Sequence, residues 1–127
     1  MEKVTGIGGI FFKAKNPKIL AEWYQKHLGI NFGDGTYFGF KWINYNNPNL
    51  PGITAFSFFK ETTDHFKPSE KPYMINFRVK NLVELLGELK KENVTVLGEI
   101  QEFEYGKFGW IMDPEENKIE LWEPVDD

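Results

Sequence analysis

The stretch GIFFKAKNPKILAEWYQKHLGINF, residues 9–32, has a near copy in MINFRVKNLVELLGELKKENVTV, residues 74–96. In each copy an alternating apolar run is followed by an asparagine, Asn16 or Asn81, and then by apolar residues at helical spacing. Asparagine is a common N-cap residue, because its side chain accepts hydrogen bonds from the free backbone N–H groups of a helix start. Each copy therefore predicts a strand that leads directly into a helix.

The helices are expected to end at Gly29 and Asn93, because glycine and asparagine tolerate the left-handed conformation found at helix C-termini. Further strands are expected after each helix, at 30–33, 37–45 and 53–59 in the first copy and at 94–102, 108–112 and 118–123 in the second. A unit of this size cannot enclose its own core. Two copies side by side could form one curved sheet, with the helices outside and a cleft inside.

We therefore predict an α+β fold made of two tandem βαβββ modules in a single domain over residues 1–127. Module one covers about 4–60, a polar connector covers 61–72, and module two covers about 73–124.

The composition narrows the functional classes. The 127 residues contain no cysteine, which excludes disulfides, thiolate metal sites and cysteine nucleophiles. The formal net charge of −4 does not indicate a nucleic-acid-binding protein, because such proteins usually carry an excess of basic residues. No long apolar run is visible, so we expect a cytoplasmic protein without membrane contact. Aromatic residues make up 17% of the chain, which indicates a dense core or an aromatic-lined cavity.

Two segments, KNPKILAEWYQKHLGI (15–30) and GWIMDPEENKIELWEP (109–124), resemble the vicinal oxygen chelate (VOC) superfamily of glyoxalase, bleomycin-resistance and dioxygenase-type proteins. The resemblance implies a half-open barrel of two βαβββ modules around a cleft, and a homodimer. It also implies a metal held by four side chains on the first and last strands of the modules. The family usually has glycine where this chain has Glu116, so Asn117 is expected to take the left-handed turn conformation.

The resemblance places the four metal-ligand positions on Gly9, on 54–56, on Met74 and on Glu120. Only Glu120 carries a side chain that suits a divalent metal. We therefore expect no metal and no other cofactor. The alternative is a non-standard divalent site completed by His65 or a connector carboxylate.

The chain has two histidines, and for both of them the sequence favours an interpretation without a role in the site. His27 lies near the end of the first predicted helix, where a cation interacts well with the helix dipole. His65 lies in the polar connector, where an exposed histidine without a function is expected. The alternative for His65 is a place in a lid over the cleft.

A carboxylate between aromatic residues needs a positive partner or hydrogen bonds. Strand alternation puts Arg78 on the same face as Glu120, so we expect these two candidate catalytic residues to form a bidentate pair. The alternative is that Glu120 points to solvent on an edge strand. Alternation and aromatic content give a set of candidate ligand-binding residues: Phe11, Lys13, Met74, Asn76, Tyr105, Trp110 and Trp122.

Two functions follow from the resemblance and these residues. The first is a metal-free binding protein for a small aromatic or oxyanionic molecule, similar to the antibiotic-sequestering branch of the superfamily. The second is an enzyme of the lyase, isomerase or dioxygenase type. In that enzyme Glu120 would act as a general base with a raised pKa, and Arg78 or Lys13 would hold an oxyanion. Glyoxalase I activity itself is not expected, because the metal positions are missing.

Overall fold

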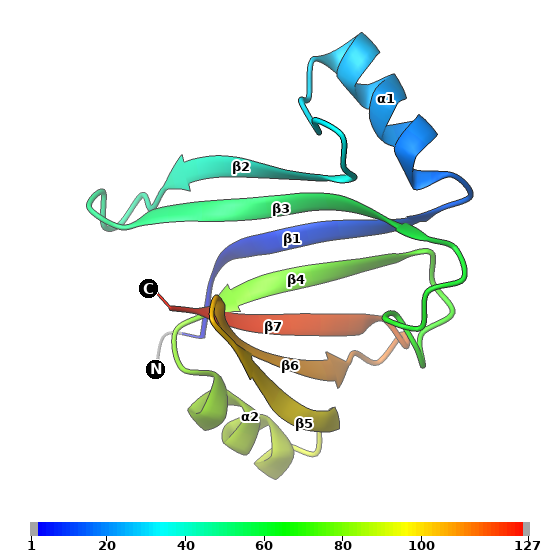
Figure 1. Cartoon of the computed structure of the whole chain (residues 1–127). Coiled ribbons are helices and arrows are strands. Elements are labelled where there is room, and N and C mark those ends of the chain that lie inside the picture. The colour runs from blue at the N-terminus through cyan, green and yellow to red at the C-terminus, as the bar shows by residue number, and fades with distance from the viewer. Residues whose placement is uncertain (1–2, 126–127) are drawn as a thin grey trace.

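The computed structural model of the protein describes residues 3–125. The elements run in the order β1 (Val4–Ala14), α1 (Pro17–Leu28), β2 (Tyr37–Ile43), β3 (Pro51–Lys60), β4 (Tyr73–Val79), α2 (Leu82–Lys91), β5 (Thr95–Phe103), β6 (Gly106–Met112) and β7 (Lys118–Pro124). The seven strands form one mixed, open sheet in the order β2-β3-β1-β4-β7-β6-β5. Figure 1 shows α1 beside one end of this sheet and α2 beside the other. The predicted α+β class is confirmed.

The two halves of the chain pair their strands in the same way. In the first half β1 runs parallel to β3, and β3 pairs antiparallel with β2. In the second half β4 runs parallel to β7, which pairs antiparallel with β6. The halves join through the antiparallel pair of β1 and β4 at the middle of the sheet (Figure 1). Residues near the middle of these two strands therefore lie between the halves.

The segment expected as a strand at 30–33 is not a strand, so the first half is βαββ. Gly29 and Gly33 have positive φ angles of 70° and 62°, which strand backbone does not adopt. The Asn31 side chain also accepts a hydrogen bond from the Gly33 N–H, which closes a turn. Phe32 is buried against Phe58 under α1. Its apolar character reflects this packing, not a strand.

The helix boundaries agree with the sequence-based expectations. The side chains of Asn16 and Asn81 each accept a hydrogen bond from the backbone N–H three residues later, at 3.1 and 3.0 Å. Gly29 ends α1 in the left-handed conformation, and Asn93 after α2 has φ 65°. Within residues 3–125 no helix is long and apolar enough to cross a membrane.

The turn between β6 and β7 differs from the expectation. Glu116, not Asn117, has the positive φ of 64°. The Asp113 side chain explains the difference, because its Oδ1 accepts the backbone N–H groups of Glu115 and Asn117. The Asn117 amide also donates to Asp113 Oδ2 at 2.8 Å. Because both the backbone N–H and the side chain of Asn117 are bound to Asp113, the left-handed residue is Glu116, one position earlier.

The helices cover one face of the sheet and leave the other for the site. Leu82, Leu85 and Leu86 of α2 pack on Val79 and Leu121 of the strands. Because side chains alternate along a strand, Arg78 and Glu120 lie on the opposite face. That face carries a cluster formed by Phe11, Phe66, Met74 and Trp110. Phe66 belongs to the connector, which therefore folds onto the sheet.

Candidate functional site

The Glu120 carboxylate is the centre of the helix-free face. The side chain lies on β7 and is 4% exposed. Its Oε1 accepts a hydrogen bond from Asn76 Nδ2 at 2.7 Å, and its Oε2 accepts one from Trp110 Nε1 at 2.9 Å. The strand register explains both contacts, since Glu120 pairs with Asn76 on β4 and with Trp110 on β6. The alternative of a solvent-facing Glu120 is therefore wrong.

A third partner comes from the connector. His65 Nε2 lies 2.9 Å from Glu120 Oε2. The His65 ring stacks on Phe59 with centroids 5.5 Å apart, and the His65 carbonyl accepts a hydrogen bond from Lys118 Nζ at 2.6 Å. His65, expected as an exposed loop residue without a function, is thus a hydrogen-bond partner of Glu120. The sequence held one signal, because Phe66 is the only large apolar side chain within 60–72 and so anchors the connector.

The environment keeps Glu120 ionised at neutral pH. Burial raises the pKa of its carboxyl, but the hydrogen bonds from His65, Asn76 and Trp110, together with the His65 charge, outweigh burial and hold the pKa below its usual value. An ionised carboxylate only accepts hydrogen bonds. Asn76 therefore presents its NH₂ group to Glu120, and His65 presents its Nε2–H.

Arg78 lies on the same face as Glu120, as expected, but the predicted pair between them is replaced by the contacts above. In the parallel register Arg78 lies opposite Trp122, not Glu120. Its guanidinium lies over the rings of Trp122 and Trp42, at 5.0 and 5.4 Å from their centroids. Arg78 is 5% exposed and holds the two tryptophans, one from each half, against the sheet.

A cleft of about 400 Å³ opens beside Glu120 on this face. The residues that line it are Gly8, Phe11, Tyr37, Ile53, Ala55, Ser57, Phe59, Asn76, Tyr105, Phe108, Glu120 and Trp122. The cleft is walled mainly by aromatic and small side chains. Among these described lining residues, Glu120 is the one with a charged side chain.

The predicted ligand-binding residues divide into two groups. Phe11, Asn76, Tyr105 and Trp122 line the cleft with Glu120. The other three lie apart from the lining. Met74 and Trp110 are buried in the cluster with Phe66, and Lys13 Nζ lies over the Phe66 ring at 5.6 Å. Trp110 still acts on the site through its hydrogen bond to Glu120.

Gly8 shapes the base of the cleft. A Cβ at this position would lie 2.1 Å from Asn76 Oδ1 and 3.1 Å from the Trp122 ring. Any larger residue would push the Asn76 amide or the Trp122 indole away from β1. Trp122 also stacks in parallel on Phe108, with centroids 5.9 Å apart and an interplanar angle of 6°. The glycine thus lets a flat aromatic wall lie close to the backbone.

The donor set at Glu120 does not fit a divalent metal. Among the residues that the structure describes, no group of three or more His, Cys, Asp or Glu side chains could hold a metal ion. Glu120 and His65 are bonded to each other, and the N–H groups of Asn76 and Trp110 point at the same carboxylate. A metal ion at that carboxylate would meet hydrogen-bond donors where it needs lone pairs.

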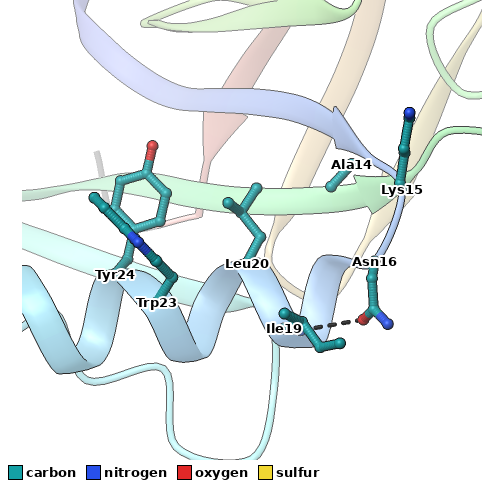
Figure 2. Close-up of a pocket in the computed structure, with 7 residues that line it drawn as sticks. All are labelled: Ala14, Lys15, Asn16, Ile19, Leu20, Trp23 and Tyr24. Atoms are coloured by element: carbon teal, nitrogen blue, oxygen red, sulfur yellow. Dashed lines mark hydrogen bonds between the residues drawn. The ribbon is translucent and has the colours of Figure 1, made fainter.

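A second pocket, of about 510 Å³, lies on the helix-covered face beside α1. Figure 2 shows its lining side chains, Ala14, Lys15, Asn16, Ile19, Leu20, Trp23 and Tyr24. The Asn16 side chain already caps α1 through its bond to the Ile19 N–H, which Figure 2 marks. This pocket lacks the converging polar groups that a specific binding site uses. The cleft at Glu120 is therefore the candidate site.

No protein-family model matches the chain, and no curated protein sequence matches it. Solved structures do match. A methylmalonyl-CoA epimerase from Mycobacterium tuberculosis is 16% identical, with a TM-score of 0.66 over 98% of this chain and 91% of the other. A Streptomyces coelicolor methylmalonyl-CoA epimerase variant in complex with 2-nitronate-propionyl-CoA is 14% identical, with a TM-score of 0.68 over 96% of this chain and 99% of the other.

A glyoxalase/bleomycin resistance protein/dioxygenase superfamily member from Vibrio splendidus 12B01 is 8% identical, with a TM-score of 0.60 over 92% of this chain and 97% of the other. This chain has the VOC fold. The predicted fold is thereby confirmed. At these identities the likeness concerns the arrangement of the chain, and the VOC fold hosts proteins of several activities. The function has to be argued from the cleft.

Proposed function

We propose that this VOC-fold protein binds a small planar aromatic molecule in the cleft at Glu120, without a metal. The observation that carries the proposal is the aromatic-walled cleft of about 400 Å³ with one buried, ionised carboxylate at its base. Ligand sites for small molecules are typically of this size, and they combine apolar walls with a few placed polar groups.

The cleft walls suit a flat ring. Trp122 and Phe108 form a parallel stacked pair on the second-half side of the cleft. Phe11 and Phe59 meet edge to face, with centroids 5.5 Å apart, on the first-half side. A planar ligand between these walls would gain stacking and edge contacts at little cost in side-chain entropy. The Arg78 guanidinium packs on the Trp122 ring and keeps this wall in place.

The hydrogen bonds at Glu120 favour binding over the enzyme alternative. A general base works best with a pKa near the working pH. The pKa of Glu120 is instead held below its usual value, and three donors surround the carboxylate. Such a group is a weak base. It serves better as a fixed negative end of a binding cleft.

The proposal is tested by calorimetric titration with planar aromatic compounds, such as quinolines and naphthalenes, on the unmodified chain and on Trp122→Ala. We expect micromolar binding to at least one ring system and a loss of at least about tenfold in Trp122→Ala, because stacking contributes roughly 0.5–1.5 kcal/mol beyond the buried area. Trp23→Ala is the matched control, since Trp23 lies in the other pocket on α1. Equal losses in the two variants, or no binding by any ring compound, would contradict the proposal.

The homodimer and the cytoplasmic location stay predictions. Light scattering coupled to size-exclusion chromatography measures the first, because a dimer would double the 14.8 kDa mass of the chain. A stoichiometry of one ligand per chain would further show that each chain has its own cleft.

A further inference from the structure

The buried amide of Asn76 carries information about the ligand. Asn76 is 2% exposed, and its Nδ2 donates to Glu120 Oε1. Its Oδ1 is a buried acceptor with no hydrogen-bond partner. Buried polar atoms without a partner are rare in folded proteins and are costly, so each one asks for an explanation.

Exchanging the positions of Oδ1 and Nδ2 by a flip of the Asn76 amide would not remove the unpaired acceptor without a cost. If Oδ1 faced Glu120, two acceptors would meet and the buried carboxylate would lose a donor. The bond to the ionised Glu120 therefore fixes which atom is left over. Oδ1 occupies the space above Gly8 that a side chain would otherwise fill, beside the ring of Trp122. Asn76, Gly8 and Trp122 all line the cleft, so this covered acceptor lies directly behind the cleft wall.

The positive side chains on this face contact other groups of the protein, and the Arg78 guanidinium lies over the Trp42 and Trp122 rings. Lys13 lies over the Phe66 ring, and Lys118 donates to the His65 carbonyl. Burial also lowers the pKa of Lys118, although attraction to Glu120 partly offsets this. What the cleft offers at its base is a pair of acceptors on neighbouring side chains, one of them a carboxylate. This favours a ligand that donates hydrogen bonds and disfavours an oxyanion.

We propose that the ligand is a planar nitrogen heteroaromatic cation with an amino group next to the ring nitrogen. Its ring would stack on Trp122, and its two adjacent N–H groups would donate to Asn76 Oδ1 and to the Glu120 carboxylate. A small shift of the Trp122 ring on stacking would open the covered Oδ1 to the ligand. The inference rests on the proposed function and narrows it, because it replaces the aromatic-or-oxyanionic expectation with a cationic donor.

The test compares ligands of matched shape on the whole chain by calorimetry. The probes are 2-aminoquinoline, 2-methylquinoline and naphthalene-2-carboxylate. We expect 2-aminoquinoline to bind at least about tenfold more tightly than 2-methylquinoline, and the carboxylate to bind most weakly. Asn76→Leu should reduce the preference for 2-aminoquinoline over 2-methylquinoline to less than about threefold. Trp23→Ala should keep the preference.

The outcomes separate this inference from the proposed function. If 2-methylquinoline or the carboxylate binds as tightly as 2-aminoquinoline, the cleft takes aromatic ligands but the donor inference is overturned. If no ring compound binds at all, the proposed function fails and the inference fails with it. Since Asn76→Leu breaks a buried hydrogen bond and could unfold the chain, the ligand comparison on the unmodified protein decides the result independently.

Discussion

Replacement of Glu120 by glutamine should destabilise the protein at neutral pH and much less in acid. Glutamine keeps the shape of the side chain but removes the charge that three donors, from Asn76, Trp110 and His65, surround. It also puts an NH₂ group where one carboxylate oxygen accepted. The hydrogen bonds become weaker, and at least one donor faces another donor.

The size of the effect follows from these contacts. A hydrogen bond to a charged group is worth roughly 1.5–3 kcal/mol and a neutral one roughly 0.5–1.5 kcal/mol, so each of the three bonds loses about 1 kcal/mol. The facing donors add about 1 kcal/mol. The lower cost of burying a neutral amide offsets part of this. We expect a loss of about 3 kcal/mol in the free energy of unfolding at pH 7.

The pH dependence follows from the direction of the pKa shift. The folded state holds the pKa of Glu120 below its ordinary value of 4.5. The stability that ionised Glu120 contributes is therefore fully present above the unfolded-state pKa. It is lost as the pH falls through the lowered pKa of the folded state. The stability curves of Glu120→Gln and the unmodified protein should converge in that acid range.

Urea unfolding followed by tryptophan fluorescence, at pH 7 and at several pH values below 5, measures both effects. Glu102→Gln is the control, because Glu102 is an exposed carboxylate on β5. It should cost less than about 0.5 kcal/mol at every pH. A loss in Glu120→Gln that stays constant with pH, or one below about 1 kcal/mol at pH 7, would refute the assignment of an ionised, multiply bonded Glu120.

Other substitutions test the parts of the fold that position the site. Phe66→Ala should cost about 3–5 kcal/mol in urea unfolding, because its fully buried ring anchors the connector on the sheet, whereas exposed Lys67→Ala should cost little. Asn81→Ala should cost about 1 kcal/mol, measured in the same way, through loss of the cap on α2. Gly106→Ala should lower the melting temperature, because Gly106 has φ 134° and a Cβ there would lie 2.4 Å from the Glu123 carbonyl oxygen.

Local signals made the fold predictable from the sequence. Asn16 and Asn81 cap helices through their own side chains, and Gly29 and Asn93 take left-handed backbone angles. These effects act within a few residues, so a single sequence reveals them. The expectation failed at 30–33, where an apolar residue in a turn looked like part of a strand. Packing of Phe32 against Phe58, which is distant in the sequence, decides the structure of this segment.

The partners of Glu120 were less predictable. Strand alternation placed Asn76, Arg78 and Glu120 on one face, but it gives no register between β4 and β7. A shift of two residues along a strand keeps the face and changes the partner. That shift separates the expected Arg78 contact from the observed Asn76 contact. His65 was harder still, since no periodicity dictates where a connector lies.

The connector that joins the halves also supplies a hydrogen-bond partner, His65, to the Glu120 carboxylate. An exchange of halves between proteins of this fold would preserve the β1–β4 pairing that joins the halves. It would not carry the site along with either half, because His65 and Phe66 belong to the joining segment. A functional chimera would need the segment 61–72 to travel with the half that contains Glu120. Transfer of the site between chains therefore depends on the joining segment as well as on the half that contains Glu120.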